Sequence, residues 1–325
     1  MARQINWEHQ IGPRLRLRDL HVLYMVAERG SMAKAAAELG ISQPAVSDVI
    51  ANLEHRLGVR LFDRSPQGVE PTMYGEALVK RSLAAFDELK QGVRDIEFLS
   101  DPTSGELRLG CVETLSATLV PQIILRFSAL YPRVVVHVDD WTAPAVELPG
   151  LRDRKYDLIL VRLVKALSDE HWADDLNVEC IFTDQLVVAT GVHNRWARRR
   201  RVDLAELIDE PWILAQPGTW NYAGVAEAFK ARGLGVPKAS LVSVSVALRT
   251  RLLANGPFIT ALPNSVVQLN RDHYALKALP VELPDRPWPV VIVTLRNRTL
   301  SPVVERFIGC AREVAKSMGR GPKAP

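Results

Sequence analysis

The sequence has few cysteines and lacks the patterns of common catalytic and metal sites. Its three cysteines, Cys111, Cys180 and Cys310, form no C-x-x-C pair, and no His stands at metal-ligand spacing. A disulfide scaffold is not needed at this chain length, and the cysteine usage fits a reducing compartment. Ser-x-Gly elbows and Gly-rich phosphate loops are also missing. We therefore predict no cofactor, no metal site and no enzymatic activity.

Long hydrophobic runs are absent as well. No stretch approaches the roughly 18 consecutive apolar residues of a membrane span, and residues 1–19 contain no apolar core of signal-peptide length. A cytoplasmic protein that does not contact the membrane is expected. With 325 residues, 47% hydrophobic, the composition is that of an ordinary globular chain with two or three domains.

Net charge is small and unevenly distributed. The formal charge is +4, but residues 1–100 contain 13 basic and 13 acidic side chains, so the excess lies in residues 101–325. Arg195 and the run Arg198 to Arg201 supply five of those positive charges. We interpret this run as a solvated loop because apolar stretches flank it. Bulk charge therefore does not identify the function.

The segment from Leu17 to Leu57 has a helical pattern with two short breaks, at residues 30–31 and 40–42. Ser31 and Ser42 stand where N-caps belong, Pro44 lies in the first turn of the third helix, and Gly40 closes the second. Two helices joined by a turn of three or four residues form a helix-turn-helix.

Two short strands and a long helix are predicted next. Residues 59–62 and 68–70 indicate strands around a polar turn at 63–67, which together would form a wing. Residues 73–99 form one helical pattern of roughly 40 Å. Its apolar stripe consists of Val79, Leu83, Phe86, Leu89, Val93 and Ile96. Since the small domain before it cannot cover this stripe, the pattern predicts a dimer.

Residues 101–105 form a hinge-like stretch of helix-breaking residues, and strands and helices alternate after it. Strands are predicted at 107–110, 134–138 and 158–163, with helical patterns at 119–130 and around 148–154. A second set follows, with strands at 186–189, 212–214 and 258–262 and helices near Leu204 and at 222–232 and 246–254. Late strands at 274–279 and 290–295 and a helix at 302–318 complete the chain. The order predicts two α/β lobes with a cleft between them.

Several motifs resemble those of LysR-type transcriptional regulators. They are the segment Ser31 to Ser47 (SMAKAAAELGISQPAVS), Leu57 to Arg64 (LGVRLFDR), Pro71-Thr72, Gly105 to Gly110 (GELRLG), Phe127 to Pro132 and Tyr156 to Leu160. The resemblance reaches at least to Ala261-Leu262-Pro263. It implies an α+β multidomain fold: a winged helix-turn-helix at 15–72, a dimerisation helix at 73–100, a hinge, and an effector domain at 106–325. That domain would resemble type II periplasmic binding proteins, with a second lobe at approximately 181–268, and tetramers are common in the family.

The third helix is the candidate recognition element. Its apolar stripe faces the core, which leaves Pro44 and Asp48 outside and Gln43 and Ser47 on the N-terminal flank. In the major groove Gln43 could pair with adenine, Ser47 would tolerate several bases, and Ala45 could touch a thymine methyl. A carboxylate repels the DNA backbone, so Asp48 either accepts from cytosine N4, lies just outside the interface, or forms a salt bridge to Arg56 or Lys34.

Further DNA contacts are expected from the flanking elements. Lys34 and Arg64 are candidates for phosphate contact, although Arg64 could instead pair with Asp63 or Glu54. Ser31 and Ser42 could touch phosphate or act only as N-caps. Thr72, at the end of the wing, completes the predicted interface.

The resemblance also places an effector pocket between the lobes. Its first side would be Cys111, Glu113 and Thr114, facing Trp141 and Thr142, and its second side Gln216, Thr219 and Trp220. Helix starts near Thr114 and Thr142 would favour an anionic group, which Arg162 could pair with unless it binds Asp157 or Asp169. Glu113 departs from this scheme because its carboxylate would repel an anion and could indicate a hydroxyl-rich or cationic effector. Cys111 is interpreted as a small buried side chain rather than a redox sensor.

These features predict a sequence-specific regulator whose DNA binding responds to a small molecule. The expected partners are double-stranded DNA with an inverted repeat, the effector, further copies of the chain as a homodimer or homotetramer, and RNA polymerase. The alternative is a solute-binding protein or enzyme whose N-terminal helices serve only for oligomerisation.

Overall fold

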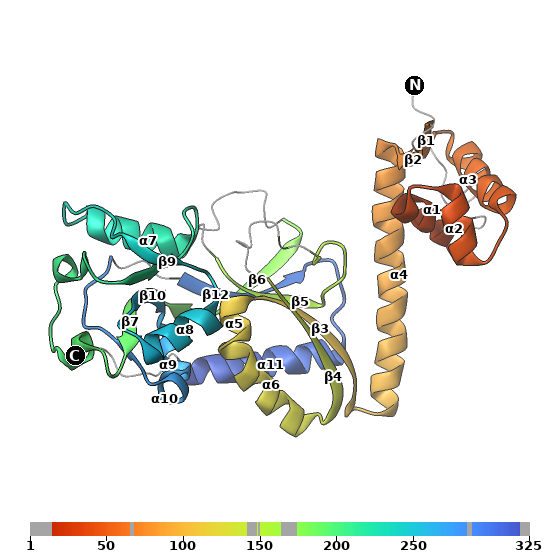
Figure 1. The fold of residues 1–325 in the computed structure, drawn as a ribbon. Coiled ribbons are helices and arrows are strands. Elements are labelled where there is room, and N and C mark those ends of the chain that lie inside the picture. Colours follow the sequence, from red (N-terminus) through yellow and green to blue (C-terminus); the bar gives the residue numbers. More distant parts are fainter. Residues whose placement is uncertain are drawn as a thin grey trace. The chain divides into compact units, whose positions relative to one another are not determined.

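The chain forms two compact units in a computed structural model, and each is described by itself. The structure describes residues 15–65, 68–141, 148, 150–163, 174–284 and 288–318. One unit ends at Gly92 and the other begins at Val93. Figure 1 shows the helix that runs from the first into the second.

Three helices form the core of the first unit: α1 (Leu17–Arg29), α2 (Met32–Leu39) and α3 (Gln43–Leu57). The hydroxyl of Ser31 accepts from the amide of Lys34 and that of Ser42 from the amide of Ala45, both at 3.4 Å. Gly40 closes α2 at φ +64°, a backbone conformation that favours glycine. The predicted helix-turn-helix is confirmed.

The wing consists of β1 (Phe62–Ser65) antiparallel to β2 (Gly68–Pro71). The first strand therefore begins three residues later than the prediction of 59–62, which was wrong. Glu54 of α3 explains the shift, because its Oε1 accepts from the amides of Leu61 and Phe62 at 2.7 and 3.2 Å. The amides of the residue before β1 and of the first residue of β1 are thus bonded to a side chain of α3.

Helix α4 (Met73–Ser100) confirms the predicted long helix. Thr72 precedes it and accepts from the amide of Gly75 at 3.2 Å. Leu89, Val93 and Ile96, which lie on one side of the helix at spacings of four and three residues, are 53%, 56% and 65% exposed. These side chains form an apolar stripe of α4 that is exposed in the described part of the single chain.

The first lobe of the second unit contains a five-stranded sheet in the order β4-β3-β5-β12-β6. Its strands are β3 (Ser104–Val112), β4 (Arg133–Trp141), β5 (Leu158–Arg162), β6 (Leu176–Asp184) and β12 (Trp288–Leu295). The first three are parallel, as the alternation of strands and helices predicted, whereas β12 is antiparallel to β5 and β6. The sequence pattern had not indicated β6.

Helices cover this sheet. They are α5 (Glu113–Ser116), α6 (Leu119–Leu130) and the C-terminal α11 (Pro302–Met318), and α6 and α11 lie side by side in Figure 1. The rings of Phe127 and Phe307 join the two helices edge to face, with centroids 5.2 Å apart. The helix predicted around 148–154 is wrong, since residues 150–154 form turns. Gly150 takes φ +80°, and a Cβ there would lie 2.7 Å from the Tyr156 ring.

The second lobe has its own sheet, in the order β11-β7-β10-β8-β9. Its strands are β7 (Leu186–Gly191), β8 (Trp212–Leu214), β9 (Ala239–Val242), β10 (Ile259–Pro263) and β11 (Leu276–Ala278). Its helices are α7 (Trp220–Lys230), α8 (Val246–Asn255), α9 (Asn264–Leu269) and α10 (Arg271–Tyr274), with 3-10 turns η3 (Arg195–Arg198) and η4 (Leu204–Leu207). Strand β11 lies beyond residue 268, where the sequence placed the end of this lobe. The chain enters the lobe after Asp184 and leaves it before Trp288.

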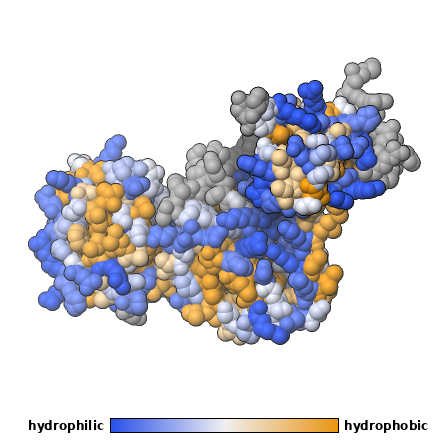
Figure 2. Space-filling model, turned by 45° about the vertical axis from the view of Figure 1, so that its right-hand side comes forward, coloured by the Kyte–Doolittle hydropathy of each residue, from blue (hydrophilic) through white to orange (hydrophobic). Residues whose placement is uncertain are grey.

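Exposed apolar side chains occur on both lobes. They are Leu125 and Leu130 of α6, Val135 and Val138 of β4, and Val192, Val236, Val242 and Leu248 in the second lobe. Figure 2 shows hydrophobic residues gathered in patches on the face that it draws. Within the described residues, no helix combines the length and the hydrophobicity needed to span a bilayer.

Candidate nucleic-acid interface and effector site

Helix α3 has one buried and one exposed side, as predicted. Val46 and Ile50 are fully buried among the residues of α1 and α2, and Gln43 and Asp48 are exposed. Pro44, Ala51 and His55 share the exposed side, and Ala45 is half-buried. An exposed first turn of this width fits the major groove.

Two predicted DNA contacts have their hydroxyls bound within the domain. Ser47 Oγ donates to the sulfur of Met32 at 3.3 Å. Thr72 Oγ1 donates to the carbonyl of Arg60 at 2.7 Å, while it caps α4. Both side chains therefore fix the position of α3 or α4 in the free protein.

The cations Lys34 and Arg64 are exposed on α2 and β1. Within the described chain neither has an ion-pair partner, and the carboxylate of Glu54, one alternative partner of Arg64, is bonded to backbone amides instead. Asp48 likewise forms no ion pair among the described residues, so the expected salt bridge to Arg56 or Lys34 is not found there. Both cations remain free to contact phosphate.

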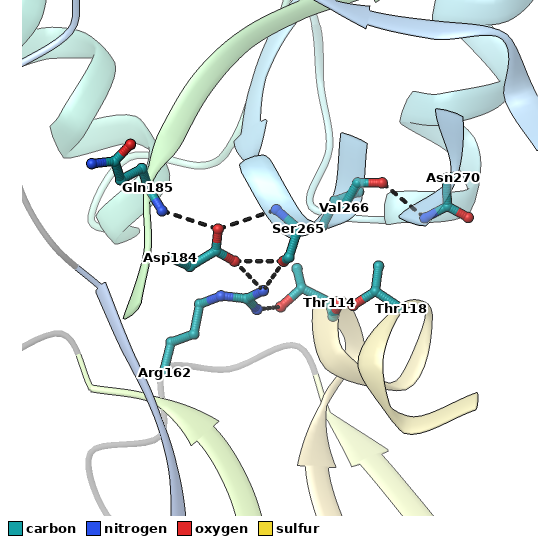
Figure 3. A network of polar contacts seen from close by, with 8 residues as sticks. All are labelled: Thr114, Thr118, Arg162, Asp184, Gln185, Ser265, Val266 and Asn270. Atoms are coloured by element: carbon teal, nitrogen blue, oxygen red, sulfur yellow. Dashed lines mark hydrogen bonds and ion pairs between the residues drawn. The ribbon is translucent and has the colours of Figure 1, made fainter. Parts of the chain in front are cut away.

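The second candidate site lies at the carboxyl ends of β3 and β5, where open α/β sheets bind ligands. Arg162, the last residue of β5, is 4% exposed. Its Nη1 donates to the Thr114 hydroxyl, and its Nη2 contacts Asp184 Oδ2 and Ser265 Oγ, both at 3.0 Å (Figure 3). Burial lowers the pKa of Arg162, and the charge of Asp184 opposes this shift. Among the described residues the carboxylate partner of Arg162 is Asp184 instead of the predicted alternative Asp157.

Asp184 connects the two lobes through this network. It ends β6 of the first lobe, and its Oδ1 accepts from the amides of Gln185 at 3.0 Å and Ser265 at 3.1 Å. Ser265 belongs to α9 of the second lobe, and its hydroxyl donates to Asp184 Oδ2 at 2.5 Å. Arg162 thus faces a carboxylate of its own chain at the point where the backbone crosses between lobes.

Glu113 provides another bridge between the lobes. Its Oε1 accepts from the amide of Val246, the first residue of α8, at 2.9 Å. The sequence suggested that the Glu113 carboxylate would repel an anionic effector. In the structure this carboxylate is bound to a backbone amide of the second lobe. Burial lowers the pKa of Arg249, which also belongs to α8, and the negative charge of Glu113 raises it in part.

Trp141 and Cys111 each pack in a hydrophobic cluster of the first lobe. The Trp141 ring stacks on Tyr156, with centroids 6.1 Å apart, in the hydrophobic cluster of Leu151 and Ile159. Cys111 is fully buried in the cluster of α6 and α11. Burial, followed by the nearby Asp140 and Asp139, raises the pKa of the Cys111 thiol to about 12, which supports the prediction of an inert side chain.

The residues predicted to line the pocket from the second lobe, Gln216, Thr219 and Trp220, lie at the start of α7. Thr219 caps α7, and its hydroxyl donates to the carbonyl of Gln216 at 2.6 Å. The Gln216 side chain is exposed. Trp220 packs on Trp288 of β12, with centroids 4.4 Å apart, and so connects the second lobe to the first. Thr142 and Asp169 lie outside the described residues.

Sequence reasoning missed Asp184, Ser265 and Arg249. They stand 71, 152 and 136 positions from Glu113, and no local pattern marks them. The one available signal was charge within an apolar stretch, as at Arg249. Asp157, in turn, serves another structure: it accepts from Arg298 at 2.8 Å and from Arg94 at 3.4 Å.

Three aspartates of the first lobe, Asp139, Asp140 and Asp175, form polar contacts with neighbouring side chains. Asp139 pairs with Lys155 at 2.8 Å and accepts from the Tyr156 hydroxyl, contacts that hold the pKa of Asp139 below its usual value. Asp140 accepts from Ser116 at 2.6 Å. Asp175 pairs with Arg152 at 3.0 Å. In the described part of the chain no group of three His, Cys, Asp or Glu side chains could hold a metal.

Comparison with known proteins supports this division of the chain. Residues 17–76 match the model of bacterial regulatory helix-turn-helix proteins of the LysR family, and residues 100–316 match the LysR substrate binding domain. The uncharacterized regulator YdcI of Escherichia coli is 26% identical over 300 residues, covering 92% of this chain and 96% of its own.

Solved structures show the same fold. A full-length OxyR variant from Pseudomonas aeruginosa superimposes with a TM-score of 0.61 at 20% identity, covering 96% of this chain and 99% of its own. CbnR in complex with its target DNA superimposes with a TM-score of 0.51 at 20% identity, covering 93% of this chain and 100% of its own.

The helix-turn-helix followed by a two-lobed α/β domain defines a DNA-binding transcriptional regulator. The chain belongs to the LysR family, because the model of the family's substrate binding domain matches more than half of it. This assignment favours the regulator over a solute-binding protein or enzyme with N-terminal helices used only for oligomerisation.

Proposed function

We propose that the protein binds a specific inverted repeat through α3 and that a small molecule bound between the two lobes controls this binding. The observation that carries the DNA proposal is the exposed first turn of α3, opposite its buried stripe. CbnR, a structural neighbour, has been solved with its target DNA. A regulator with this role works in the cytoplasm, needs no catalytic activity and contacts RNA polymerase.

Gel shifts with the DNA upstream of its own gene test the interface. Gln43→Ala should lose on the order of 1–3 kcal/mol of binding free energy at the specific site and almost none on random DNA. Arg64→Ala should weaken binding to both DNAs and lower the salt slope by about one, because Arg64 would neutralise a phosphate. Wild-type affinity and salt slope in both variants would refute the interface.

We further propose a homodimer through α4, which can pair again into a tetramer. Leu89 is the better site for a test than Phe86, because the Phe86 ring already contacts His21 of α1, with centroids 5.9 Å apart. Leu89→Asp would place an unpaired charge in the helix seam and should dissociate the dimer in sedimentation. Lys90→Asp, at an exposed neighbour, is the control that should remain dimeric. A monomeric wild type at micromolar concentration would contradict the proposal.

The effector site is proposed around Thr114 and Arg162, with Glu113 beside them and Trp220 on the second lobe. Binding there would change the angle between the lobes and so the spacing of the two recognition helices. Thermal-shift screening of the full chain against metabolites should find a compound whose stabilisation falls in Thr114→Ala. An unchanged shift in that variant would show that the compound binds elsewhere.

A further inference from the structure

The N-terminus of α8 is occupied by groups of the protein itself. Glu113 accepts from the first amide of the helix, at Val246, and the Ser245 hydroxyl accepts from the amide of Leu248 at 3.4 Å. Free amides at a helix start carry partial positive charge and favour an anion. Here the anion is a carboxylate from the other lobe, so a free carboxylate would have to compete with it.

The charge of Glu113 also acts on Arg249, which belongs to α8. The Arg249 side chain is 2% exposed, and its guanidinium donates to neutral acceptors, the Thr260 hydroxyl and the Ala261 carbonyl. Burial lowers the pKa of Arg249 to about 10, and the negative charge of Glu113 works against this shift. The hydrogen bond from the Val246 amide therefore holds a negative charge of the first lobe at the start of the helix that carries this buried cation.

One buried donor near Glu113 remains unused. Arg162 Nε is buried and has no hydrogen-bond partner among the described residues, although both terminal nitrogens of this guanidinium are bonded. Figure 3 shows Arg162 between Thr114, which follows Glu113, and Ser265 of the other lobe. Since Asp184 already balances the charge of Arg162, Nε needs an acceptor but no further negative charge.

We propose that Glu113 is a tethered anion that fills the place of an effector carboxylate at α8, and that the effector presents an uncharged hydrogen-bond acceptor to Arg162. The inference rests on the proposed effector site. A tethered group acts at an effective concentration of about millimolar or more, and displacing it would remove the negative charge that counters the burial of Arg249. A carbonyl or hydroxyl compound neither competes with the Glu113 carboxylate nor removes its charge from the surroundings of Arg249.

Chemical rescue with acetate tests the tethered anion. Thermal unfolding of the full chain is followed in sodium acetate and in sodium chloride of equal ionic strength, for wild type, Glu113→Ala, Glu113→Gln and the exposed control Glu282→Ala. Acetate should raise the Tm of Glu113→Ala by about 2–4 °C over chloride, as expected for a ligand present at several times its Kd. The other three proteins should have the same Tm in acetate and in chloride. In wild type and Glu282→Ala the Glu113 carboxylate occupies the site, and in Glu113→Gln the glutamine side chain fills it.

Two results would overturn the inference: no acetate effect on Glu113→Ala, or an equal effect on wild type. If Glu113→Ala does not fold in chloride, its refolding yield replaces the Tm, and equal yields in both salts would count against the proposal. Acetamide at the same concentration should not rescue this variant, since it lacks the charge.

The ligand class has its own readout. In a library of matched acids and amides, the compounds that stabilise wild type should be uncharged, and their effect should fall in Arg162→Lys, which lacks Nε–H. Stabilisation by acids alone would refute this class. A failure of the gel shift with intact acetate rescue would refute the DNA-binding role and leave the tethered anion standing.

Discussion

Removal of the carboxylate at Asp184 should destabilise the second unit strongly. The side chains of Asp184 and Arg162 are only 3% and 2% exposed, and Nη2 lies 3.0 Å from Oδ2. In Asp184→Ala the buried guanidinium keeps, among the described residues, the hydroxyls of Thr114 and Ser265 as partners. The amides of Gln185 and Ser265 lose their acceptor as well. Breaking a buried pair in this way costs about 3–5 kcal/mol of unfolding free energy.

Urea unfolding followed by tryptophan fluorescence measures this loss. Six of the seven tryptophans of the chain lie after residue 92, so the signal reports on the second unit. Glu179→Ala is the matched control, because it breaks an exposed pair with Arg312 at 2.6 Å, worth about 0–1 kcal/mol.

A double variant separates the charge from the packing. Arg162→Met combined with Asp184→Leu removes both charges and should recover part of the lost stability, since apolar replacements of similar volume can match a buried pair. A loss below about 1 kcal/mol in Asp184→Ala, comparable with that of Glu179→Ala, would refute the argument that Asp184 compensates a buried cation.

Three further predictions concern the wing and the thiols. Gly75→Ala should lower the stability of the first unit by about 1–3 kcal/mol, because a Cβ would lie 2.1 Å from the Leu61 carbonyl oxygen, and circular dichroism during thermal unfolding would detect it. Glu54→Ala should cost a similar amount, about 1–3 kcal/mol, since it removes the acceptor of the Leu61 amide; an unchanged Tm would contradict this. A thiol reagent at pH 8 should label Cys180, which is exposed, before Cys111, whose pKa of about 12 keeps it protonated. Rapid labelling of Cys111 in peptide mass spectra would refute its burial.

The helices were predictable where capping and periodicity agree. Ser31, Ser42 and Gly40 mark ends that the structure places as expected, because each acts within a few residues of its own position. The first strand of the wing was misplaced because Glu54, seven residues earlier, binds the amide of Leu61. The turns at 150–154 were mistaken for a helix because Leu148 and Leu151 have helical spacing. Both are buried in one hydrophobic cluster, but Gly150 between them takes a positive φ that ends any helix there.

The effector site was less predictable, since its contacts join distant parts of the sequence. Arg162 was singled out at the end of a strand, but the sequence offered only nearby carboxylates as partners. Its partner Asp184 comes from β6, a strand whose pattern of burial does not alternate. Glu113 was recognised as a departure from an anion site, yet its amide partner stands 133 residues away.

Buried arginines link these observations into one physical argument about the second unit. Arg162, Arg249 and Arg298 are each at most 7% exposed. Arg162 and Arg298 pair with the carboxylates of Asp184 and Asp157, and the negative charge of Glu113 raises the pKa of Arg249 against the effect of burial. The carboxylates of Asp184 and Glu113 also accept hydrogen bonds from backbone amides of the second lobe. Parting the lobes would leave buried charge with fewer partners, which costs free energy. A compound that alters the angle between the lobes must therefore offset that cost with contacts of its own, and its differential affinity for the two arrangements sets how far DNA binding can change.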